Sequence, residues 1–441
     1  MKTVIMAGGK GTRICAIASD IPKPMIPIEG KPVLEHEINC LRKQGFTDFI
    51  ITVSHLGKVI MDYFGDGHQF GVHIQYYFEE KPLGNAGALF KLKNQLTEDF
   101  LLINADAIFD IDFNRLASFH RKHGALVTLF AHPNNHPYDS GLLIVDGEGY
   151  VKQWLTKEDI RPQWYKNRVN AGLHIMNPKV LDLTGINPDD IGKEINGAIL
   201  KVDLDRQILK PLCGSRQIIC YTSPEYLKDM GTPDRYESVC KDFKEGRIKA
   251  KNLKQKQKAF FLDREGTINK YVGFLKRIED FELLPGVAEA IRIINEAGYL
   301  VIVVTNQPVI ARGELSLVEL EQIHDKMETL LGDKGAYLNA IYYCPHHPNK
   351  GFDGEIPELK IECNCRKPKP GMLFQAAEDF NIDLSQSWMV GDSENDIKAG
   401  HAVGCKTIFL GKGNYGQNET AKDLLDAVYH QLESQTTFNK A

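Results

Sequence analysis

The sequence predicts an α/β protein of two successive domains, in each of which short strands alternate with helices. Three observations support this prediction. The 441 residues exceed the usual size of one domain, apolar β-rich runs alternate with helical patterns, and this alternation starts twice. Hydrophobic residues make up 43% and charged residues 25% of the chain, as is usual for globular proteins. We therefore expect two domains with separate hydrophobic cores.

The first alternation runs from Lys2 to about Tyr221. The expected strands are residues 3–7, 48–54, 73–78, 99–105 and 125–131. The helical segments between them include residues 32–45 and 113–124. Strands that are separated by helices favour a mostly parallel sheet with helices around it. A further helix from Pro233 to about Gly246 precedes a lysine-rich stretch without an apolar face, which indicates a linker over 246–257.

The second alternation begins at Ala259. Its expected strands are residues 259–263, 299–305, 339–344, 387–392 and 406–411, with helical patterns after Pro285, Ser316, Gly371 and Glu394. The predicted domains are therefore 1–245 and 258–441, joined by the linker 246–257.

Composition argues against several classes of protein. A net charge of −5 gives no reason to expect a nucleic-acid partner, because nucleic-acid-binding surfaces are usually strongly basic. No apolar run approaches the roughly 20 residues of a membrane span. The N-terminus has the pattern of a strand and a glycine loop, not of a signal peptide. Nine scattered cysteines do not suggest a disulfide framework. We expect a cytoplasmic protein, and a homo-oligomer is compatible with the sequence.

A glycine-rich loop directly follows the first strand in "MAGGKGTR". Its glycines lack a Cβ, which lets backbone N–H groups approach a phosphate. These glycines are Gly8, Gly9 and Gly11. Thr12 and Arg13 then supply a hydroxyl and a guanidinium, and Lys23 follows between two prolines that favour an extended segment. A tight turn is the simpler interpretation of such a loop alone, but the nearby cations favour a nucleotide site.

Over about Met1 to Glu245 the chain resembles the sugar-phosphate nucleotidylyltransferase family, which has a Rossmann-like fold. The glycine motif and Pro-Lys-Pro are followed in the family's order by "EKPLGNAGAL", "NADAIFDID", "NAGLHIMN" and "LKDMGTPDRY". The chemistry of this family is attack by a sugar 1-phosphate oxygen on the α-phosphorus of a nucleoside triphosphate. Such a reaction needs positioning and charge neutralisation, and no covalent enzyme intermediate.

The resemblance implies roles for individual residues in nucleotide binding. Asp106 and Asp229 would bind Mg²⁺, and Gly84 would lie beside the base. Lys23 and Arg13 would hold the triphosphate, together with Thr12 and the glycine loop. Two carboxylates are suitable ligands for Mg²⁺ in a phosphoryl-transfer site.

The same resemblance implies that Lys157 and Asn170 hold the sugar phosphate. The chain departs from the family pattern at Ala105, where glycine is usual, and at Thr156, where glutamate is usual. The neighbouring aspartate and lysine remain in each case. The pattern is most similar to the branch that guanylylates D-glycero-D-manno-heptose 1-phosphate, which implies GTP as the nucleotide. Another sugar or another nucleotide stays open.

Four motifs of the second half resemble the haloacid dehalogenase phosphatase superfamily, over about 258–433. They place Asp263, Thr305, Lys367 and Asp392 at strand ends, in the family's order. The resemblance implies that Asp263 attacks phosphorus, since an ionised carboxylate needs no base to activate it. Thr305 would bind the transferring group and Lys367 would stabilise its charge. Mg²⁺ would bind Asp263, Asp392 and the backbone carbonyl at position 265.

Glu265 stands where the family has the aspartate that serves as general acid and base. It keeps the carboxyl group and the carbonyl but adds one methylene. A displacement of about 1 Å can lower a rate roughly a hundredfold. The sequence therefore predicts a slowed phosphatase. A non-catalytic binding or scaffolding domain is the alternative.

A long loop between the second and third motifs contains four metal-binding side chains on two short arms. They are Cys344, His346, Cys363 and Cys365. One Cys-x-His pair and one Cys-x-Cys pair together supply four ligands, which suits a closed tetrahedral zinc site. We expect one structural Zn²⁺, which would fix the loop so that Arg366 and Lys367 are correctly placed. His347 is not expected to be a ligand, and free buried cysteines are the alternative.

This zinc loop closely resembles that of the D-glycero-D-manno-heptose 1,7-bisphosphate 7-phosphatases. Histidinol-phosphate phosphatases share much of the pattern. The two resemblances support each other, because removal of the 7-phosphate yields heptose 1-phosphate, the substrate of the guanylyltransferase reaction. The sequence therefore predicts a bifunctional enzyme that uses heptose 1,7-bisphosphate, heptose 1-phosphate and GTP, with Mg²⁺ in both active sites and Arg366 near the sugar phosphate.

Overall fold

The computed structural model describes residues 1–9, 21–54, 56–195 and 197–438, which form two compact units. Unit 1 consists of Met1–Ala131, Leu143–Leu155 and Asn170–Asn252. Unit 2 consists of Leu253–Ala441 and two segments from the first half of the sequence, His132–Leu142 and Thr156–Val169. The chain thus passes between the units more than once.

The main sheet of the first half has the strand order β10-β9-β11-β6-β1-β4-β5, with β8 beside β11 and β14 beside β8. The strands are β1 (Thr3–Met6), β4 (Asp48–Val53), β5 (His73–Phe78), β6 (Phe100–Asn104), β8 (Val127–His132), β9 (Leu142–Val145), β10 (Val151–Leu155), β11 (Val169–Met176) and β14 (Ile218–Thr222). The pairs of β1 with β4 and β6, β4 with β5, and β8 with β14 are parallel. β11 runs antiparallel to β6, so the sheet is mixed beyond its parallel centre.

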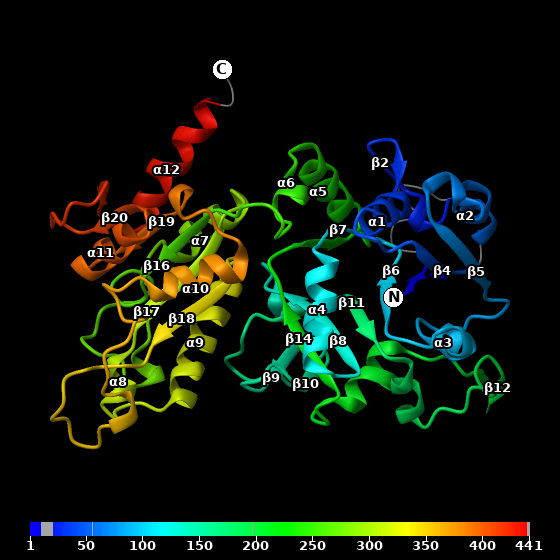
Figure 1. The fold of residues 1–441 in the computed structure, drawn as a ribbon, viewed down its shortest axis with the longest axis horizontal. Helices are drawn as coiled ribbons and strands as arrows, with labels where there is room; N and C mark the ends of the chain where they lie inside the picture. The colour runs from blue at the N-terminus through cyan, green and yellow to red at the C-terminus, as the bar shows by residue number, and fades with distance from the viewer. Residues whose placement is uncertain (10–20, 55, 196, 439–441) are drawn as a thin grey trace. The chain divides into compact units, whose positions relative to one another are not determined.

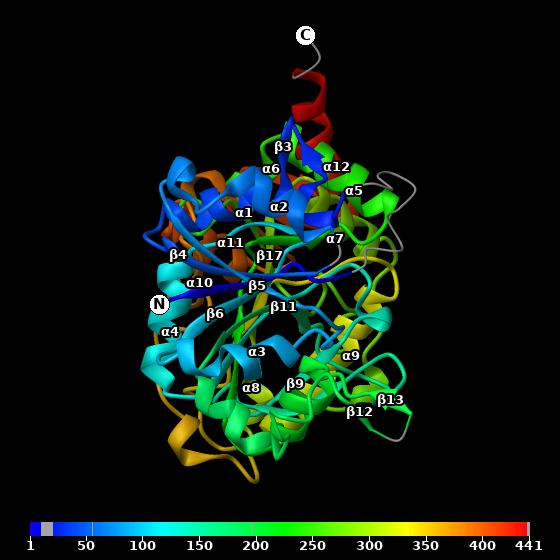
Figure 2. The same cartoon turned by 90° about the vertical axis from the view of Figure 1, so that its right-hand side faces the viewer.

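Helices cover both faces of this sheet because its central strands are apolar on both sides. Ile5 and Ile51 belong to one cluster with residues of α1 (Val33–Arg42), α2 (Gly57–Phe64) and α4 (Phe113–His123). Val4 and Ile50 belong to another cluster with α3 (Gly87–Leu92). Successive residues of a strand point to opposite faces, so each strand contributes to both cores. Figure 2 shows α1 and α2 above the strands and α3 below them.

Smaller elements complete the first half. The remaining strands and α-helices are β2 (Pro27–Ile28), β3 (Lys31–Pro32), β7 (Ala107–Asp110), β12 (Glu194–Ile195), β13 (Ala198–Ile199), β15 (Tyr226–Asp229), α5 (Pro233–Lys244) and α6 (Arg247–Ala250). The short helices are η1 (Lys23–Met25), η2 (His68–Phe70), η3 (Lys93–Gln95), η4 (Pro137–Asp139), η5 (Pro178–Thr184), η6 (Leu204–Leu209) and η7 (Lys210–Leu212). β7 and β15 pair antiparallel as a separate ribbon.

The sheet of unit 2 is parallel throughout, with the order β18-β17-β16-β19-β20-β21. Its strands are β16 (Ala259–Leu262), β17 (Leu300–Asn306), β18 (Ala340–Cys344), β19 (Trp388–Gly391), β20 (Lys406–Leu410) and β21 (Glu419–Ala421). The helices are α7 (Val287–Glu296), α8 (Pro308–Ala311), α9 (Leu317–Gly332), α10 (Gly371–Phe380), α11 (Glu394–Ala402) and α12 (Leu424–Phe438), with the short η8 (Ile278–Asp280), η9 (Pro357–Leu359) and η10 (Leu384–Gln386).

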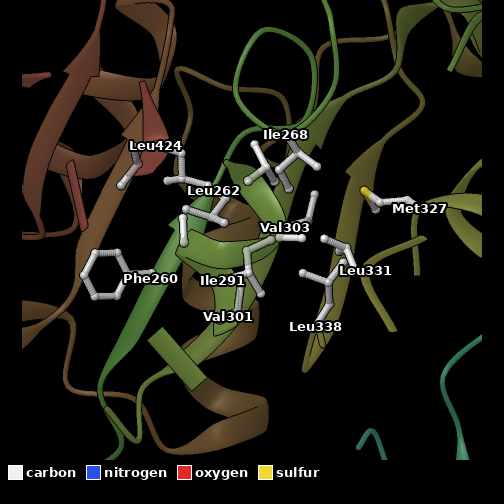
Figure 3. Packing of buried hydrophobic residues seen from close by; sticks show 14 of the residues in the cluster. Phe260, Leu262, Ile268, Ile291, Val301, Val303, Met327, Leu331, Leu338 and Leu424 are labelled. Atoms are coloured by element: carbon white, nitrogen blue, oxygen red, sulfur yellow. The ribbon is translucent and has the colours of Figure 1, made fainter. Parts of the chain in front are cut away.

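The alternation of side chains along β16 divides the core of unit 2 into two layers. Phe260 and Leu262 pack with residues of α7, α9 and α12. Figure 3 shows this layer, in which Ile291 of α7 lies against Val301 and Val303 of the neighbouring strand. Ala259 and Phe261, the alternate residues of β16, face the other layer, which includes residues of α10 and Ala399 of α11. The sheet therefore lies between two helical layers, as Figure 1 also shows.

The two early segments of unit 2 are held against α9 by hydrogen bonds. Thr329 Oγ1 accepts from the backbone N–H of Tyr165 at 2.8 Å and lies 3.0 Å from its carbonyl oxygen. Glu328 Oε2 accepts from the backbone N–H of Asn167 at 2.9 Å. Lys326 lies over the ring of Trp164 at 5.4 Å. Unit 2 is therefore discontinuous in sequence.

The predicted central strands and helices are confirmed, with boundaries that differ by at most three residues. The antiparallel strands β9, β10 and β11 and the helix α12 were not predicted as elements. Within the described part of the chain, no helix has the length and apolar character needed to cross a membrane.

Candidate active sites

The first candidate site lies where the ribbon β7·β15 begins. Asp229 pairs with Ala107 in the antiparallel register, so it is adjacent to Asp106. The backbone N–H of Met230 donates to the carbonyl of Asp106 at 2.9 Å, which fixes the turn. The ribbon thus brings together two carboxylates that are more than a hundred residues apart in sequence. Pairing of β7 with β15, and not a local sequence motif, places Asp106 and Asp229 next to each other.

Two cations neutralise these carboxylates. Lys23 Nζ lies 3.1 Å from Asp106 Oδ2. Arg235, in the first turn of α5, donates from Nη1 to both oxygens of Asp229 at 2.8 and 2.7 Å. Burial opposes ionisation of Asp229, but Arg235 and the N–H of Gly231 outweigh it and lower the pKa of this carboxyl. Both aspartates are suitable oxygen ligands for Mg²⁺.

Glu37 is a third carboxyl beside this pair, and sequence reasoning missed it. It lies on α1 and is only 1% exposed. Its Oε1 accepts from the backbone N–H of Ala107 at 3.3 Å, while Oε2 has no hydrogen-bond partner among the described residues. Burial and the charge of Asp106 raise the pKa of Glu37 well above its usual value. An acidic residue on the apolar face of α1 was the signal that could have revealed it.

The glycine loop is described only in part. Ser54 Oγ donates to the carbonyl of Gly8 at 2.7 Å, and a Cβ on Gly8 would lie 3.0 Å from Glu79 Oε1. Among the described residues, no atom lies within 4 Å of the position that a Cβ on Gly9 would take. Gly11, Thr12 and Arg13 lie outside the described residues. Their expected contacts with a triphosphate therefore stay predictions.

Gly84 occupies a position that the backbone itself restricts. Its φ is +87°, and a Cβ would lie 2.3 Å from the carbonyl oxygen of Val202. The chain around Val202 is fixed there by hydrogen bonds to Leu83 and Ala86. A side chain at Gly84 would displace this segment. Its proximity to a nucleotide base stays a prediction.

The two residues expected to hold the sugar phosphate differ in their surroundings. Lys157 is exposed in a turn after β10, where Asp159 Oδ2 accepts from the N–H of Thr156 at 2.8 Å. Asn170 lies on β11, and its buried Oδ1 has no hydrogen-bond partner among the described residues. An unsatisfied buried amide oxygen is costly, so a ligand that donates to it would be stabilised.

The second candidate site lies at the carboxyl ends of the strands of unit 2. Asp263 follows β16, and its N–H donates to Val390 O at 3.0 Å. Lys367 Nζ donates to Asp263 Oδ1 at 2.7 Å and to Asp396 Oδ1 at 2.5 Å. Burial opposes protonation of Lys367, but these two carboxylates outweigh it and raise the pKa of the lysine. Lys367 therefore stays charged although it is buried.

Asp263, Asp392 and Asp396 form a cluster whose carboxylate oxygens lie within 4.8 Å of one another. Burial, together with Asp263 and Asp396, raises the pKa of Asp392 to about 7. A divalent cation would relieve this repulsion, so the donor set fits Mg²⁺. Asp396 was not predicted from the sequence, although it lies four residues after Asp392 in the same motif. Its Oδ2 accepts from Ser393 Oγ at 2.6 Å.

Gly266 is required by the close approach of this cluster. Its φ is +81°, and a Cβ would lie 1.9 Å from Asp392 Oδ2. The turn is closed by a hydrogen bond from the N–H of Gly266 to Asn269 O at 2.8 Å. The backbone at position 266 can therefore pass directly beside the carboxylate of Asp392 only as glycine.

Thr305 and Glu265 are connected through two buried side chains. Gln307 Nε2 donates to Thr305 Oγ1 at 2.9 Å, and Gln307 Oε1 accepts from Arg264 Nη2 at 3.1 Å. Arg264 Nη2 also donates to Glu265 Oε1 at 2.7 Å. The sequence did not single out Arg264 or Gln307. They follow β16 and β17, two strands far apart in sequence, so their contact depends on the pairing of these strands.

The backbone of Lys367 is held by Asn306, at the end of β17. Asn306 Nδ2 donates to Lys367 O at 3.0 Å, and Asn306 Oδ1 accepts from the N–H of Lys367 at 3.0 Å. Arg366 Nη1 donates to His346 O at 3.2 Å. The loop that bears Lys367 is therefore tied to both β17 and the cysteine cluster.

The four side chains of the expected zinc site lie together. The ligand atoms of Cys344, His346, Cys363 and Cys365 are within 4.8 Å of one another. The sulfur atoms are 3.2 to 3.5 Å apart. A tetrahedral site with Zn–S bonds of about 2.3 Å places sulfurs roughly 3.7 Å apart, so the cluster is close to the size that zinc requires. His347 instead contacts Asn349 O and Arg312.

One family model matches most of the first half of the chain, and a second matches part of the second half. The model for nucleotidyl transferase matches residues 2–245, and a model described as HAD-hydrolase-like matches residues 364–434. D-glycero-beta-D-manno-heptose-1,7-bisphosphate 7-phosphatase of Haemophilus ducreyi is 43% identical over 173 residues. The matched region covers 38% of this chain and 92% of that relative.

Two solved structures are similar to separate parts of the chain. HddC from Yersinia pseudotuberculosis is 23% identical with a TM-score of 0.46, and the match covers 55% of this chain and 99% of that one. D,D-heptose 1.7-bisphosphate phosphatase from B. bronchiseptica, complexed with magnesium and phosphate, is 32% identical with a TM-score of 0.36. That match covers 40% of this chain and 99% of the phosphatase.

Proposed function

The chain belongs to the nucleotidyl transferase family and, through its haloacid dehalogenase-like half, to the family of the heptose-bisphosphate 7-phosphatases. We propose that it catalyses two successive reactions. The first removes the 7-phosphate of D-glycero-D-manno-heptose 1,7-bisphosphate. The second transfers GMP from GTP to the resulting heptose 1-phosphate and releases pyrophosphate. Residues 1–245 provide the transferase, 258–441 the phosphatase, and 246–257 join them.

The observation that supports the phosphatase most directly is the contact of Lys367 with Asp263 beside the cluster of Asp392 and Asp396. Asp263 attacks phosphorus while the bond from phosphorus to the sugar oxygen breaks. The Glu265 carboxyl gives its proton to that oxygen, and an aspartyl-phosphate remains. Glu265 then takes a proton from water, which attacks phosphorus and releases phosphate and free Asp263.

Lys367 and Thr305 bind the transferring phosphoryl group in this proposal. Lys367 also reduces the repulsion between the Asp263 carboxylate and the phosphate, which would otherwise oppose attack. Asp263, Asp392 and the Glu265 carbonyl would hold Mg²⁺, which would supply further positive charge. Cys344, His346, Cys363 and Cys365 would hold one structural Zn²⁺, which would keep Arg366 and Lys367 in place.

Nucleotidyl transfer requires no covalent intermediate. An oxygen of heptose 1-phosphate attacks the α-phosphorus of GTP, and the bond to pyrophosphate breaks. Lys23, with the glycine loop and Arg13, offsets negative charge on the triphosphate, and Lys157 and Asn170 bind the sugar phosphate. Asp106 and Asp229 would hold Mg²⁺, which would supply additional charge neutralisation. Because both substrates are soluble nucleotides and sugar phosphates, the cytoplasm is the proposed location.

The test is to supply heptose 1,7-bisphosphate and GTP together and to measure phosphate, pyrophosphate and GDP-heptose. All three products are expected. Asp263→Asn should form no phosphate yet still convert heptose 1-phosphate and GTP. Release of pyrophosphate without phosphate by the folded wild-type protein would favour a scaffolding role for the second half. Conversion of a different sugar phosphate or nucleotide in a substrate panel would correct the proposed substrates.

A further inference from the structure

Arg264 is the largest side chain that is fully buried in the described part of the protein. Its guanidinium makes three polar contacts. Nη2 donates to Glu265 Oε1 at 2.7 Å and to Gln307 Oε1 at 3.1 Å, and Nη1 lies 3.3 Å from His324 Nε2. A buried guanidinium is costly unless it is paired, so its position beside the phosphatase residues requires an explanation.

His324 contacts Arg264 but does not neutralise its charge. A guanidinium can only donate hydrogen bonds, so His324 Nε2 must accept and the proton of the neutral ring lies on Nδ1. Burial and the charge of Arg264 lower the pKa of His324 well below its usual value, which keeps the ring neutral. The carboxylate in direct contact with Arg264 is that of Glu265.

Gln307 extends the same contact to the phosphate-binding threonine. Its Oε1 is occupied by Arg264, which fixes the orientation of the amide, and its Nε2 donates to Thr305 Oγ1 at 2.9 Å. Because the threonine hydroxyl accepts this hydrogen bond, its own proton remains free to point toward a phosphate oxygen. The backbone of Gln307 is fixed by donation to Cys344 O at 2.8 Å.

We propose that Arg264 is a positioning residue of the phosphatase site. One guanidinium holds the carboxyl of Glu265 and, through Gln307, orients the hydroxyl of Thr305. The inference rests on the proposed phosphatase function. Glutamate has one more rotatable bond than aspartate, so an anchor for its carboxyl limits the displacement that the extra methylene would otherwise allow.

Lysine cannot replace this fork. An ammonium is a single compact charge, whereas the planar guanidinium of Arg264 directs Nη2 at Glu265 and Gln307 while Nη1 faces His324. Arg264→Lys keeps the charge and the approximate volume, and it should lose the simultaneous contact with Glu265 and Gln307. We expect kcat for phosphate release to fall about tenfold to a hundredfold, with KM for the bisphosphate changed by less than about threefold.

A double-mutant cycle with Glu265→Gln shows whether Arg264 acts through Glu265. If it does, the loss in Arg264→Lys/Glu265→Gln is smaller than the product of the two single losses. Arg292→Lys is the matched control, since Arg292 is exposed on α7 and paired with Glu296. It should leave kcat unchanged. Unaltered kcat in Arg264→Lys, or losses that multiply fully in the double variant, would overturn the proposal.

Gln307→Leu provides a second test that leaves Arg264 and its ion pair in place. It should lower kcat about tenfold by releasing the Thr305 hydroxyl, while zinc content and nucleotidyl transfer stay at wild-type values. A wild-type kcat in this variant would exclude the role of Arg264 in orienting Thr305. If the wild-type protein releases no phosphate, the proposed function fails first, and this inference fails with it.

Discussion

Glu265 and Gly266 are neighbours in sequence, yet the site restricts them in different ways. The carboxyl of Glu265 is held by an ion pair to Arg264, while the backbone of Gly266 is packed against Asp392. The first restriction concerns where a proton can be transferred, and the second concerns whether the site can form. Two substitutions separate these effects.

Glu265→Gln keeps the length and shape of the side chain but removes its ability to transfer a proton. We expect kcat for phosphate release to fall about a hundredfold or more, because general acid–base catalysis contributes about 10²–10⁴ in rate. Steady-state assays with the bisphosphate would measure the loss. Nucleotidyl transfer by the same preparation serves as the control. An unchanged kcat would remove Glu265 from the proposed mechanism.

Gly266→Ala adds a methyl group that would lie 1.9 Å from a carboxylate oxygen of Asp392. The backbone or Asp392 must move, so we expect phosphatase activity to fall at least about a hundredfold. Gly273→Ala, at a positive φ with no atom near the added Cβ, is the matched control for backbone strain alone. Similar losses in both variants would show that the clash with Asp392 is not the cause.

At the scale of the elements, the long loop between β18 and α10 depends on the cysteine cluster. This loop has few regular elements, and its two arms meet at Cys344, His346, Cys363 and Cys365, which could hold a metal ion. Lys367 follows Cys365 by two residues. Order in the loop and placement of Lys367 are therefore coupled.

Cys363→Ser should remove the bound zinc and most phosphatase activity, since the hard hydroxyl is a poor zinc ligand. Metal analysis of the purified wild-type protein should find one zinc per chain. Cys405→Ser, a buried cysteine outside the cluster, should keep that zinc. Freshly purified wild-type protein without zinc would contradict the structural role of the metal.

A second element-scale prediction concerns the surface of α9 that holds Tyr165. Thr329→Val removes a hydroxyl that bonds to the backbone of Tyr165, which should cost about 1–2 kcal/mol. Calorimetry should show a lower melting temperature for the transition of unit 2. Thr420→Val, at an exposed threonine of β21, should leave it nearly unchanged. Equal melting temperatures in all three proteins would show that this contact adds no stability.

The sequence was most informative where function depends on contiguous motifs. Periodicity located the central strands, and the motifs around Asp263, Lys367 and Cys363 named residues that the structure brings together. The contacts of Glu37 with Ala107 and of Arg264 with Gln307 were not predictable in the same way. They join residues from different elements, and strand register and burial decide them.

At the scale of the whole molecule, two chemically distinct sites lie in one chain. The proposed intermediate, heptose 1-phosphate, is a small molecule that can diffuse from one protein molecule to another. A mixture of Asp106→Ala and Asp263→Asn proteins should therefore convert the bisphosphate and GTP to GDP-heptose, although neither variant does so alone. Time courses of phosphate and pyrophosphate would measure both steps. Phosphate release without pyrophosphate in the mixture would contradict free diffusion of the intermediate.

The discontinuity of unit 2 has a consequence for the order in which the protein folds during synthesis. His132–Leu142 and Thr156–Val169 leave the ribosome long before α9, to which Tyr165 and Asn167 bind. Until α9 has been made, the backbone groups at Tyr165 and Asn167 must be satisfied by water or by a chaperone. The contacts between these stretches span about 160 residues, and closing so long a loop slows folding. Unit 2 should therefore complete its folding only after translation has passed α9.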